Sequence, residues 1–306
     1  MDIRQLQGMI TLINSEFSVS RTAEKMFLVQ SAVSQQLKRL EQELGSPLFV
    51  RKGKRLTGLT ELGQQVEQQA RESLNAVNNI KLLALDHIQL AQGILRIGCT
   101  HTQARYILPP VIKAFNKSYP EVELQIHQGN PQQLVEWAGN DIVDFSICTE
   151  ELAESSKLES IACYQWNRSL ITLPDHPLLQ IKKPALKDLC KYPIITYVVG
   201  FTGRQHFNNS FAKAGLKPNT VLSAADTDII KAYVLDGLGI GIIANMSYNR
   251  KSDTKLKQVD LSHLFPWETT RIAYLKNKVI RRYQQTFIDL FLQVVRQDDS
   301  NRFKAC

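Results

Sequence analysis

The chain has 306 residues, of which 43% are hydrophobic and 22% charged, with a formal net charge of +8. This length suggests about two domains, and the composition is that of a folded protein rather than a disordered one. The positive charge favours a polyanionic partner without proving one. The cysteines are scattered and odd in number, and the histidines lack metal-ligand spacing. We therefore expect free thiols in a reducing compartment, with neither a metal site nor a cofactor.

The sequence starts directly with an amphipathic pattern and lacks the features of a signal peptide. Its most apolar run, residues 234–246, contains Asp236 and is shorter than the ~20 residues that a membrane span needs. We expect a cytoplasmic protein with no membrane partner.

Residues 2–15 predict a first helix, since Asp2 can cap it and apolar residues recur at helical spacing. Residues 18–41 predict two short helices separated by a break at 27–29, with Ser18 as the N-cap of the first. The second helix has one apolar face, made of Val33, Leu37, Leu40 and Leu44. Two helices joined this tightly predict a helix-turn-helix, whose second helix enters the major groove. An ordinary helical hairpin with a solvated polar face is the alternative for these residues alone.

Short polar and cationic side chains, which suit base edges and phosphates, lie on the opposite face of the second helix and on the helix before it. This part of the predicted DNA-contacting set is Ser20, Arg21, Gln30, Ser31, Ser34, Gln35 and Lys38. A glycine flanked by cations follows between two short apolar stretches, which predicts the hairpin of a winged helix-turn-helix. The wing adds four cations that can reach phosphates or the minor groove, namely Arg51, Lys52, Lys54 and Arg55. The first three complete the predicted DNA-contacting set.

Thr60 is the predicted cap of a long helix that runs to about residue 90. Its narrow seam consists of Leu62, Val66, Ala70, Leu74, Val77, Lys81, Ala84 and Ile88. So narrow a seam fits a two-helix interface better than a core, so we predict a linker and dimerisation helix over 60–92. Docking of this helix on the chain's own C-terminal domain is the alternative. A dimer would place two recognition helices on two half-sites of DNA.

From residue 93 the pattern changes to alternating strands and helices, which predicts an α/β domain over 93–306 with open, mostly parallel sheets. One expected helix covers 102–117. The chain is long enough for two lobes, and it can cross between them near 164–168 and 265–270. We expect lobe 1 at about 93–163 and 267–295, and lobe 2 at about 164–266. This is the two-lobed, periplasmic-binding-protein-like (type 2) architecture, whose ligand lies between the lobes. The basic residues at 271–282 are read as a solvated helix face.

Hydroxyl groups occur at three places where predicted strands end or helices begin: residues 100–103, 149–150 and 200–204. Ligands of such sheets bind at these ends, where free backbone N–H groups and the helix dipole favour an oxyanion. The alternative is that these threonines are plain helix caps. No G-x-S-x-G motif and no convincing acid/base pair points to an enzyme.

The first sixty-odd residues resemble the LysR-type transcriptional regulators, a resemblance carried by Ala23-Glu24, Gln30, Ser34, Leu40-Glu41, Leu44-Gly45, Leu48-Phe49, Arg51, Leu59-Thr60 and Gly63. It implies a winged helix-turn-helix over 1–59. One departure concerns the start of the recognition helix, where the family usually has Ser or Thr followed by Gln-Pro. Here the residues are Val29-Gln30-Ser31, and Ser31 is the expected replacement cap.

Residues 94–246 resemble the CysB-like branch of that family, the activators of sulfur-assimilation genes. The likeness is carried by THTQARY (100–106), HQGNP (127–131), CYQWNRS (163–169), PDHPL (174–178), YPIITY (192–197), GFTGR (200–204) and DTDIIKAYV (226–234). It implies a site for sulfate, thiosulfate or an acetylserine-like effector at Thr100, Thr102, Gln103, Thr149, Trp166 and Thr202.

The resemblance also implies a set of partners and leaves alternatives. The expected partners are double-stranded promoter DNA, the small anionic or acetylserine-like effector and a second copy of the chain, with dimers expected to pair into tetramers. RNA polymerase is a further candidate partner. A LysR-type regulator of a different metabolic operon is the first alternative, and a solute-binding protein without a DNA role is the second.

Overall fold

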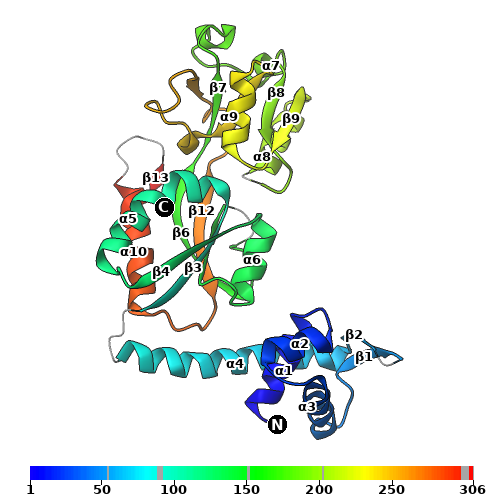
Figure 1. Cartoon of the computed structure of the whole chain (residues 1–306). Coiled ribbons are helices and arrows are strands. Elements are labelled where there is room, and N and C mark those ends of the chain that lie inside the picture. Colours follow the sequence, from blue (N-terminus) through cyan, green and yellow to red (C-terminus); the bar gives the residue numbers. More distant parts are fainter. Residues whose placement is uncertain (54, 88–91, 150–151, 202, 298–302, 306) are drawn as a thin grey trace. The chain divides into compact units, whose positions relative to one another are not determined.

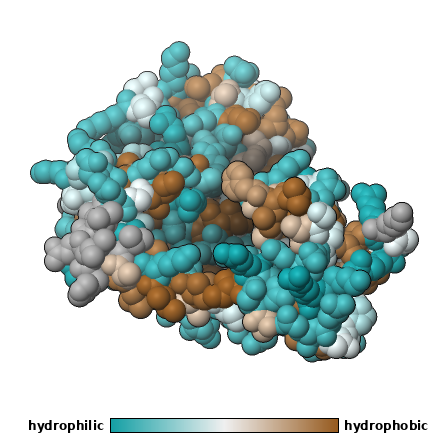
Figure 2. Space-filling view, turned by 60° about the horizontal axis from the view of Figure 1, so that its bottom comes forward, coloured by the Kyte–Doolittle hydropathy of each residue, from teal (hydrophilic) through white to brown (hydrophobic). Residues whose placement is uncertain are grey.

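The computed structural model describes residues 1–53, 55–87, 92–149, 152–201, 203–297 and 303–305 (Figure 1). The chain divides into two compact units, Met1–Gln89 and Leu90–Cys306. Among the described residues, every helix is too short or too polar to cross a lipid bilayer. The face of the molecule in Figure 2 is a mosaic of hydrophilic residues interspersed with hydrophobic clusters.

The N-terminal unit begins with the predicted helix-turn-helix. Its three helices are α1 (Ile3–Ile13), α2 (Val19–Met26) and α3 (Gln30–Glu43). Asp2 caps α1 in a reciprocal capping box with Gln5, and the Ser18 side chain caps α2, as the sequence predicts. The apolar faces of these helices meet in one core, whose fully buried members include Met9, Leu12, Val33, Leu37 and Leu40.

The turn between α2 and α3 differs in two details from the expectation. Val29 is the N-cap residue of α3 and makes no side-chain cap bond, while Ser31 lies inside the first helical turn. The predicted Ser31 cap is therefore wrong. Leu44 is the C-cap residue of α3 and is 38% exposed, so the apolar face ends at Leu40.

The wing is the predicted antiparallel hairpin of β1 (Phe49–Lys52) and β2 (Arg55–Leu59). Gly53 has a φ of 62°, a left-handed conformation that glycine adopts without steric cost. Lys54, one of the predicted DNA contacts, lies outside the described residues.

The long helix α4 (Glu61–His87) follows Thr60, whose hydroxyl accepts a hydrogen bond from the Gly63 N–H at 3.0 Å. The first half of the predicted seam packs inside its own unit, because Val66, Ala70 and Leu74 belong to the helix-turn-helix core. Leu62 is 37% exposed, and Ile88 lies outside the described residues. Among the described side chains of the distal half, the exposed large apolar ones are Ile80 (68%) and Leu83 (57%), which are not in the predicted seam.

The C-terminal unit contains two sheets. The six-stranded sheet has the order β13-β6-β12-β5-β3-β4, with β3 (Gly93–Cys99), β4 (Val122–Gln128), β5 (Phe145–Cys148), β6 (Leu158–Trp166), β12 (Glu268–Leu275) and β13 (Lys304–Ala305). The five-stranded sheet has the order β11-β7-β10-β8-β9, with β7 (Arg168–Thr172), β8 (Ile194–Tyr197), β9 (Thr220–Ala224), β10 (Ile240–Ala244) and β11 (Lys257–Asp260).

Each sheet mixes parallel and antiparallel pairs, which corrects the expectation of mostly parallel sheets. In the first sheet β4, β3 and β5 are parallel, while β12 pairs antiparallel with both β5 and β6. In the second sheet β9, β8 and β10 are parallel, and β7 is antiparallel to β10. The reason is that the chain crosses between the lobes twice, and the returning strand β12 enters the first sheet from the opposite end. The chain passes from one sheet to the other at Asn167, between β6 and β7, and returns between β11 and β12.

Helices cover both faces of each sheet (Figure 1). The helices of the first lobe are the π-helix η1 (Gln103–Ile107), α5 (Leu108–Ser118), α6 (Pro131–Gly139) and α10 (Arg282–Arg296). Those of the second lobe are α7 (Leu186–Leu189), α8 (Arg204–Lys213), α9 (Thr227–Leu235) and two short 3-10 turns, Pro177–Gln180 and Asn245–Ser247. The single helix expected over 102–117 is thus divided. Pro109 and Pro110 lack the N–H groups that would continue a regular helix across this point.

The basic residues at 271–282 do not form a solvated helix face. The Lys278 side chain is 3% exposed and contacts Asp144 at 2.8 Å, and Asp141 also contacts it. Burial by itself would lower the pKa of Lys278, but the two carboxylates outweigh it and hold that pKa above its ordinary value. This cluster holds the turn before α10 against the segment that precedes β5, so it is structural.

Candidate DNA-binding face and effector site

The exposed face of α3 holds the predicted base-contacting residues. Gln30, Ser31, Ser34, Gln35 and Lys38 are all exposed, because Val33, Leu37 and Leu40 take the buried positions of the same helix. A 3.6-residue period separates the two sets cleanly, and α3 can therefore enter a groove without losing its core contacts.

Two further candidates lie on α2. Ser20 and Arg21 are exposed, and Arg21 pairs with Glu16 at 2.9 Å. Both partners of this pair are mostly solvent-exposed, so the pair is weak and leaves Arg21 available to a phosphate.

The wing is attached to the recognition helix through Glu41. One oxygen of this carboxylate accepts from the N–H groups of Leu48 (2.9 Å) and Phe49 (3.3 Å), and the other accepts from Arg51 at 2.9 Å. Arg51 thus links the wing to α3, and this role comes in addition to the predicted phosphate contact. Lys52 is exposed on the same strand.

In the C-terminal unit, hydrogen bonds connect three of the predicted effector residues. The indole N–H of Trp166 donates to the Thr149 hydroxyl at 3.1 Å, and the hydroxyls of Thr149 and Thr270 are 3.4 Å apart. Thr270 also bonds to Tyr164, whose hydroxyl donates to the Gln103 amide oxygen at 2.8 Å. These five residues form one continuous polar chain, called here the Thr149 network. Thr149 is its half-buried member, while the other four are buried.

Sequence reasoning missed two members of the Thr149 network, Tyr164 and Thr270. Tyr164 lies two residues before Trp166 in β6, and residues two apart point to the same face of a strand. This period of two was the signal that could have identified Tyr164. Thr270 is opposite Tyr164 in the register of β12 and β6, which only the strand pairing reveals. Burial raises the pKa of Tyr164, so its hydroxyl keeps its proton at neutral pH.

Two further predicted effector residues follow β3. Thr100 and Thr102 are buried, at 6% and 3% exposure. The Thr102 side chain bonds to Tyr197, a buried tyrosine of the second lobe, so Thr102 already contacts both lobes. Thr202 lies outside the described residues.

Next to Thr102, side chains of η1 reach across to α9. Asp228 accepts hydrogen bonds from the Tyr106 hydroxyl and from Arg105 Nε, the latter at 3.3 Å. His101 Nε2 lies 3.9 Å from the same carboxylate, and Lys231 Nζ donates to the Tyr106 hydroxyl at 3.2 Å. These contacts, called here the Asp228 bridge, join the two lobes through polar groups.

The two crossing segments are joined by a buried ion pair. Arg168 at the start of β7 bonds to Glu268 at the start of β12 at 2.7 Å, and both side chains are 3% exposed. The same Arg168 nitrogen donates to the Gly203 carbonyl oxygen at 2.6 Å, and His206 Nδ1 lies 2.8 Å from the other oxygen of Glu268. The N-terminal end of α8 is therefore hydrogen-bonded to the two segments in which the chain passes between the lobes.

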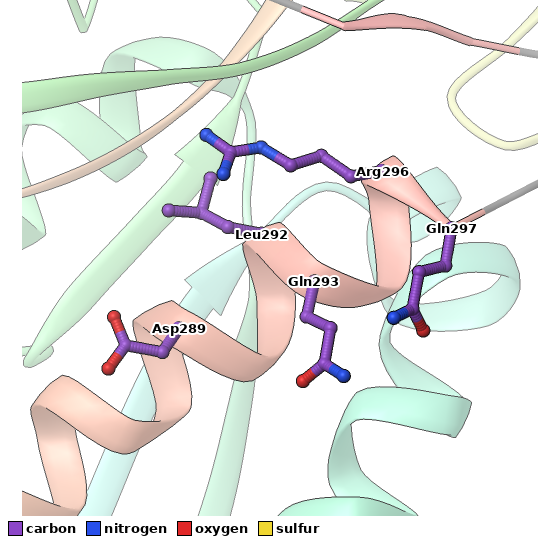
Figure 3. Close-up of a pocket in the computed structure, with 5 residues that line it drawn as sticks. All are labelled: Asp289, Leu292, Gln293, Arg296 and Gln297. Carbon is purple, nitrogen blue, oxygen red and sulfur yellow. The ribbon is translucent and has the colours of Figure 1, made fainter.

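A surface hollow of about 330 Å³ lies elsewhere, along the last turns of α10 (Figure 3). It is lined by Asp289, Leu292, Gln293, Arg296 and Gln297. These side chains are unconnected with the predicted site residues, so we do not assign the effector to this hollow. Within the described part of the chain, no group of metal-ligating side chains is assembled, and Cys99, Cys148, Cys163 and Cys190 are not in disulfides.

A helix-turn-helix domain with an exposed recognition helix, together with a two-lobed α/β domain, defines an effector-responsive, DNA-binding transcriptional regulator. Two family models match this chain: "Bacterial regulatory helix-turn-helix protein, lysR family" over residues 3–64 and "LysR substrate binding domain" over residues 89–296. The chain therefore belongs to the LysR family. Members of this family regulate transcription rather than catalyse reactions, and they bind DNA and a small effector.

Individual relatives agree with this family. The HTH-type transcriptional regulator CysB of Haemophilus influenzae is 40% identical over 95% of this chain and 90% of its own length. The crystal structure of the cofactor-binding domain of the Cbl transcriptional regulator is 38% identical, with a TM-score of 0.63, and covers 67% of this chain and 92% of its own. A full-length OxyR variant from Pseudomonas aeruginosa covers 97% of this chain and 98% of its own with a TM-score of 0.71, and at 20% identity it shows the fold alone.

Proposed function

We propose that the C-terminal unit binds sulfate, thiosulfate or an acetylserine-like effector between its lobes, and that the protein thereby controls sulfur- and cysteine-related genes. The proposed effector residues are Thr100, Thr102, Gln103, Thr149, Trp166 and Thr202, to which we add Tyr164 and Thr270 as supporting residues. The Thr149 network is the observation that carries this proposal, together with the likeness to CysB and Cbl.

The hydrogen-bond directions in the Thr149 network leave a donor that suits an oxyanion. An indole N–H can only donate, so the Thr149 hydroxyl acts as acceptor toward Trp166 and keeps its own proton to donate. Thr149 is also the half-buried member of the network, which makes its hydroxyl accessible to a ligand. Uncharged donors of this kind bind a fully ionised anion or a carboxylate by directional hydrogen bonds.

The response to the effector requires a second arrangement of the lobes. A ligand shifts such an equilibrium only by its differential affinity for the two arrangements. The Asp228 bridge and the Arg168–Glu268 pair are the contacts that depend on the lobe positions, so we propose that effector binding changes them. In a dimer formed through the distal half of α4, such a change would alter the spacing of the paired recognition helices.

Two alternatives differ in what they predict. A LysR regulator of another metabolic operon would share the DNA-binding face but bind a different effector. A solute-binding protein without a DNA role disagrees with the family match over residues 3–64.

The test is a thermal-unfolding screen of the full-length protein with sulfate, thiosulfate, O-acetylserine and N-acetylserine. A ligand at 100 times its Kd should raise the free energy of unfolding by about 2.7 kcal/mol. The Thr149→Val variant has nearly the same shape but no hydroxyl, so it should lose at least ten-fold in affinity, whereas Thr149→Ser should retain binding. If none of the four compounds stabilises the protein, the sulfur assignment is wrong and the alternative operon is favoured.

A further inference from the structure

Three consecutive apolar side chains are exposed in the turn before the recognition helix. Phe27 is 95% exposed, Leu28 39% and Val29 68%. Phe27 also has a φ of 54°, a left-handed conformation that is uncommon for a bulky residue. A single exposed apolar residue is normal, but a run of three on the surface requires a functional explanation.

The position of this run indicates what covers it. Val29 is the N-cap residue of α3, and Gln30, Ser34 and Gln35 continue along the exposed face. The N-terminal residues of a recognition helix are those that contact base edges. The cations Arg21 and Lys38 are exposed in the same helix-turn-helix, which complements the charge of duplex DNA.

Most groups in the major groove are hydrogen-bond donors and acceptors, and the thymine 5-methyl group is the apolar exception. Phe27 and Val29 have no polar side-chain atoms, and Val29 makes no cap bond to its own helix. We propose that these two side chains contact thymine methyl groups, so that the turn itself determines part of the operator sequence. This inference rests on DNA binding by the helix-turn-helix and names a base preference for that face.

The experiment starts from selection of a random-sequence duplex library with the full-length protein. The enriched duplex is then synthesised with deoxyuridine replacing thymidine at one position at a time, which removes only the methyl group. We expect one or two positions in each half-site at which this change weakens binding about fourfold, the value for one buried methyl group. Equal affinity for thymidine and deoxyuridine at every position would overturn the proposal.

Substitutions of Phe27 and Val29 test whether the preference for thymidine over deoxyuridine comes from the turn. Val29→Ser introduces a good N-cap, and Phe27→Asn suits a left-handed backbone, so both should fold, as circular dichroism and thermal unfolding will check. Each should reduce the thymidine preference to less than twofold at its own position. Lys38→Ala is the matched control, which should weaken both duplexes equally and keep their ratio. If the variants keep the wild-type ratio, the methyl groups are contacted elsewhere and the proposal fails.

The outcome also separates this inference from DNA binding as such. A library from which no duplex is enriched would contradict binding by the helix-turn-helix and remove the basis of the proposal. Enrichment of a duplex that is insensitive to deoxyuridine contradicts the thymine contact alone, and it would favour a protein partner for the apolar turn.

Discussion

The Tyr106 hydroxyl of the first lobe donates a hydrogen bond to the Asp228 carboxylate of the second. The donor lies in the π-helix that directly follows Thr102, and the acceptor lies in the first turn of α9. Residues proposed to bind the effector are therefore neighbours in sequence of a polar contact that joins the lobes. A substitution in the Tyr106–Asp228 contact should therefore alter effector binding, and effector binding should alter this contact.

Replacing Asp228 with Asn should loosen this contact. The charged pairing with Arg105 and Lys231 is lost, so the lobe arrangement shown here becomes less favoured. Because the proposed effector response moves the lobes away from this arrangement, effector affinity should rise three- to tenfold. Calorimetric titration of the stabilising effector measures this change. Asp236→Asn, at the exposed C-terminal end of α9, is the control and should leave affinity unchanged. Wild-type affinity in Asp228→Asn would show that the bridge does not affect the effector site.

Because the pKa of Asp228 is shifted in the folded protein, the unfolding free energy should depend on pH. Burial tends to raise the pKa of Asp228, but Tyr106, Lys231, Arg105 and His101 outweigh it and hold that pKa below its ordinary value of 3.8. A lowered carboxyl pKa stabilises the fold above the unfolded-state value, and this stabilisation is lost as pH falls through the folded-state value. The difference in unfolding free energy between wild type and Asp228→Asn should thus be constant above about pH 5 and decrease toward pH 3. Urea unfolding across this range tests it, and a difference that grows on acidification would contradict the assignment.

Gly203 should tolerate no side chain. Its φ is 67°, and an added Cβ would lie 2.0 Å from Arg168 Nη2 and 2.5 Å from Glu268 Oε1. Gly203→Ala must displace a buried ion pair, which should cost about 3 kcal/mol or more of unfolding free energy. Gly215→Ala is the matched control, since its φ is 68° and its Cβ would meet nothing within 4 Å. That variant should lose only roughly 1–2 kcal/mol of unfolding free energy, which is the steric cost of placing a Cβ on a left-handed backbone. Equal losses in chemical denaturation would mean that Arg168 can move away.

On the DNA-binding face, different residues should affect specificity and affinity. Gln35→Ala should relax base preference, while Lys38→Ala should weaken all sequences alike and reduce the slope of log affinity against log salt by about 1. Arg51→Ala should likewise weaken binding to all sequences and reduce the salt slope. It also removes the ion pair between the wing and Glu41, which should lower the unfolding free energy by less than about 1 kcal/mol because Arg51 is half exposed. Gel-shift titrations at several salt concentrations distinguish these effects. Loss of specificity in all three variants would contradict the division of roles.

Self-association should depend on the distal half of α4. Ile80 and Leu83 are exposed there, and burying them against a second copy would gain apolar contact area. Ile80→Glu should therefore dissociate the oligomer in sedimentation experiments and reduce DNA affinity, whereas Asn78→Glu on the opposite side of the helix should not. A monomeric wild-type protein would refute the proposed interface.

Local sequence patterns predicted much of this protein because the interactions involved are local. Asp2 and Ser18 cap helices that begin one residue later, and hydrophobic spacing alone separates the buried Val33, Leu37 and Leu40 from the exposed face of α3. The wing was predicted correctly for the same reason, since its turn residues mark the hairpin.

Tertiary structure decided what depends on partners far away in the chain. Pairing of β12 with β6 brings Thr270 to Tyr164, and the docking of α4 on its own unit buries Ala70, which the sequence predicted at a dimer interface. Lys278 is buried rather than solvated because Asp141 and Asp144 offset the cost of burying its charge. Composition and spacing do not reveal which distant group compensates a buried polar atom, so such contacts are established only when the chain has folded.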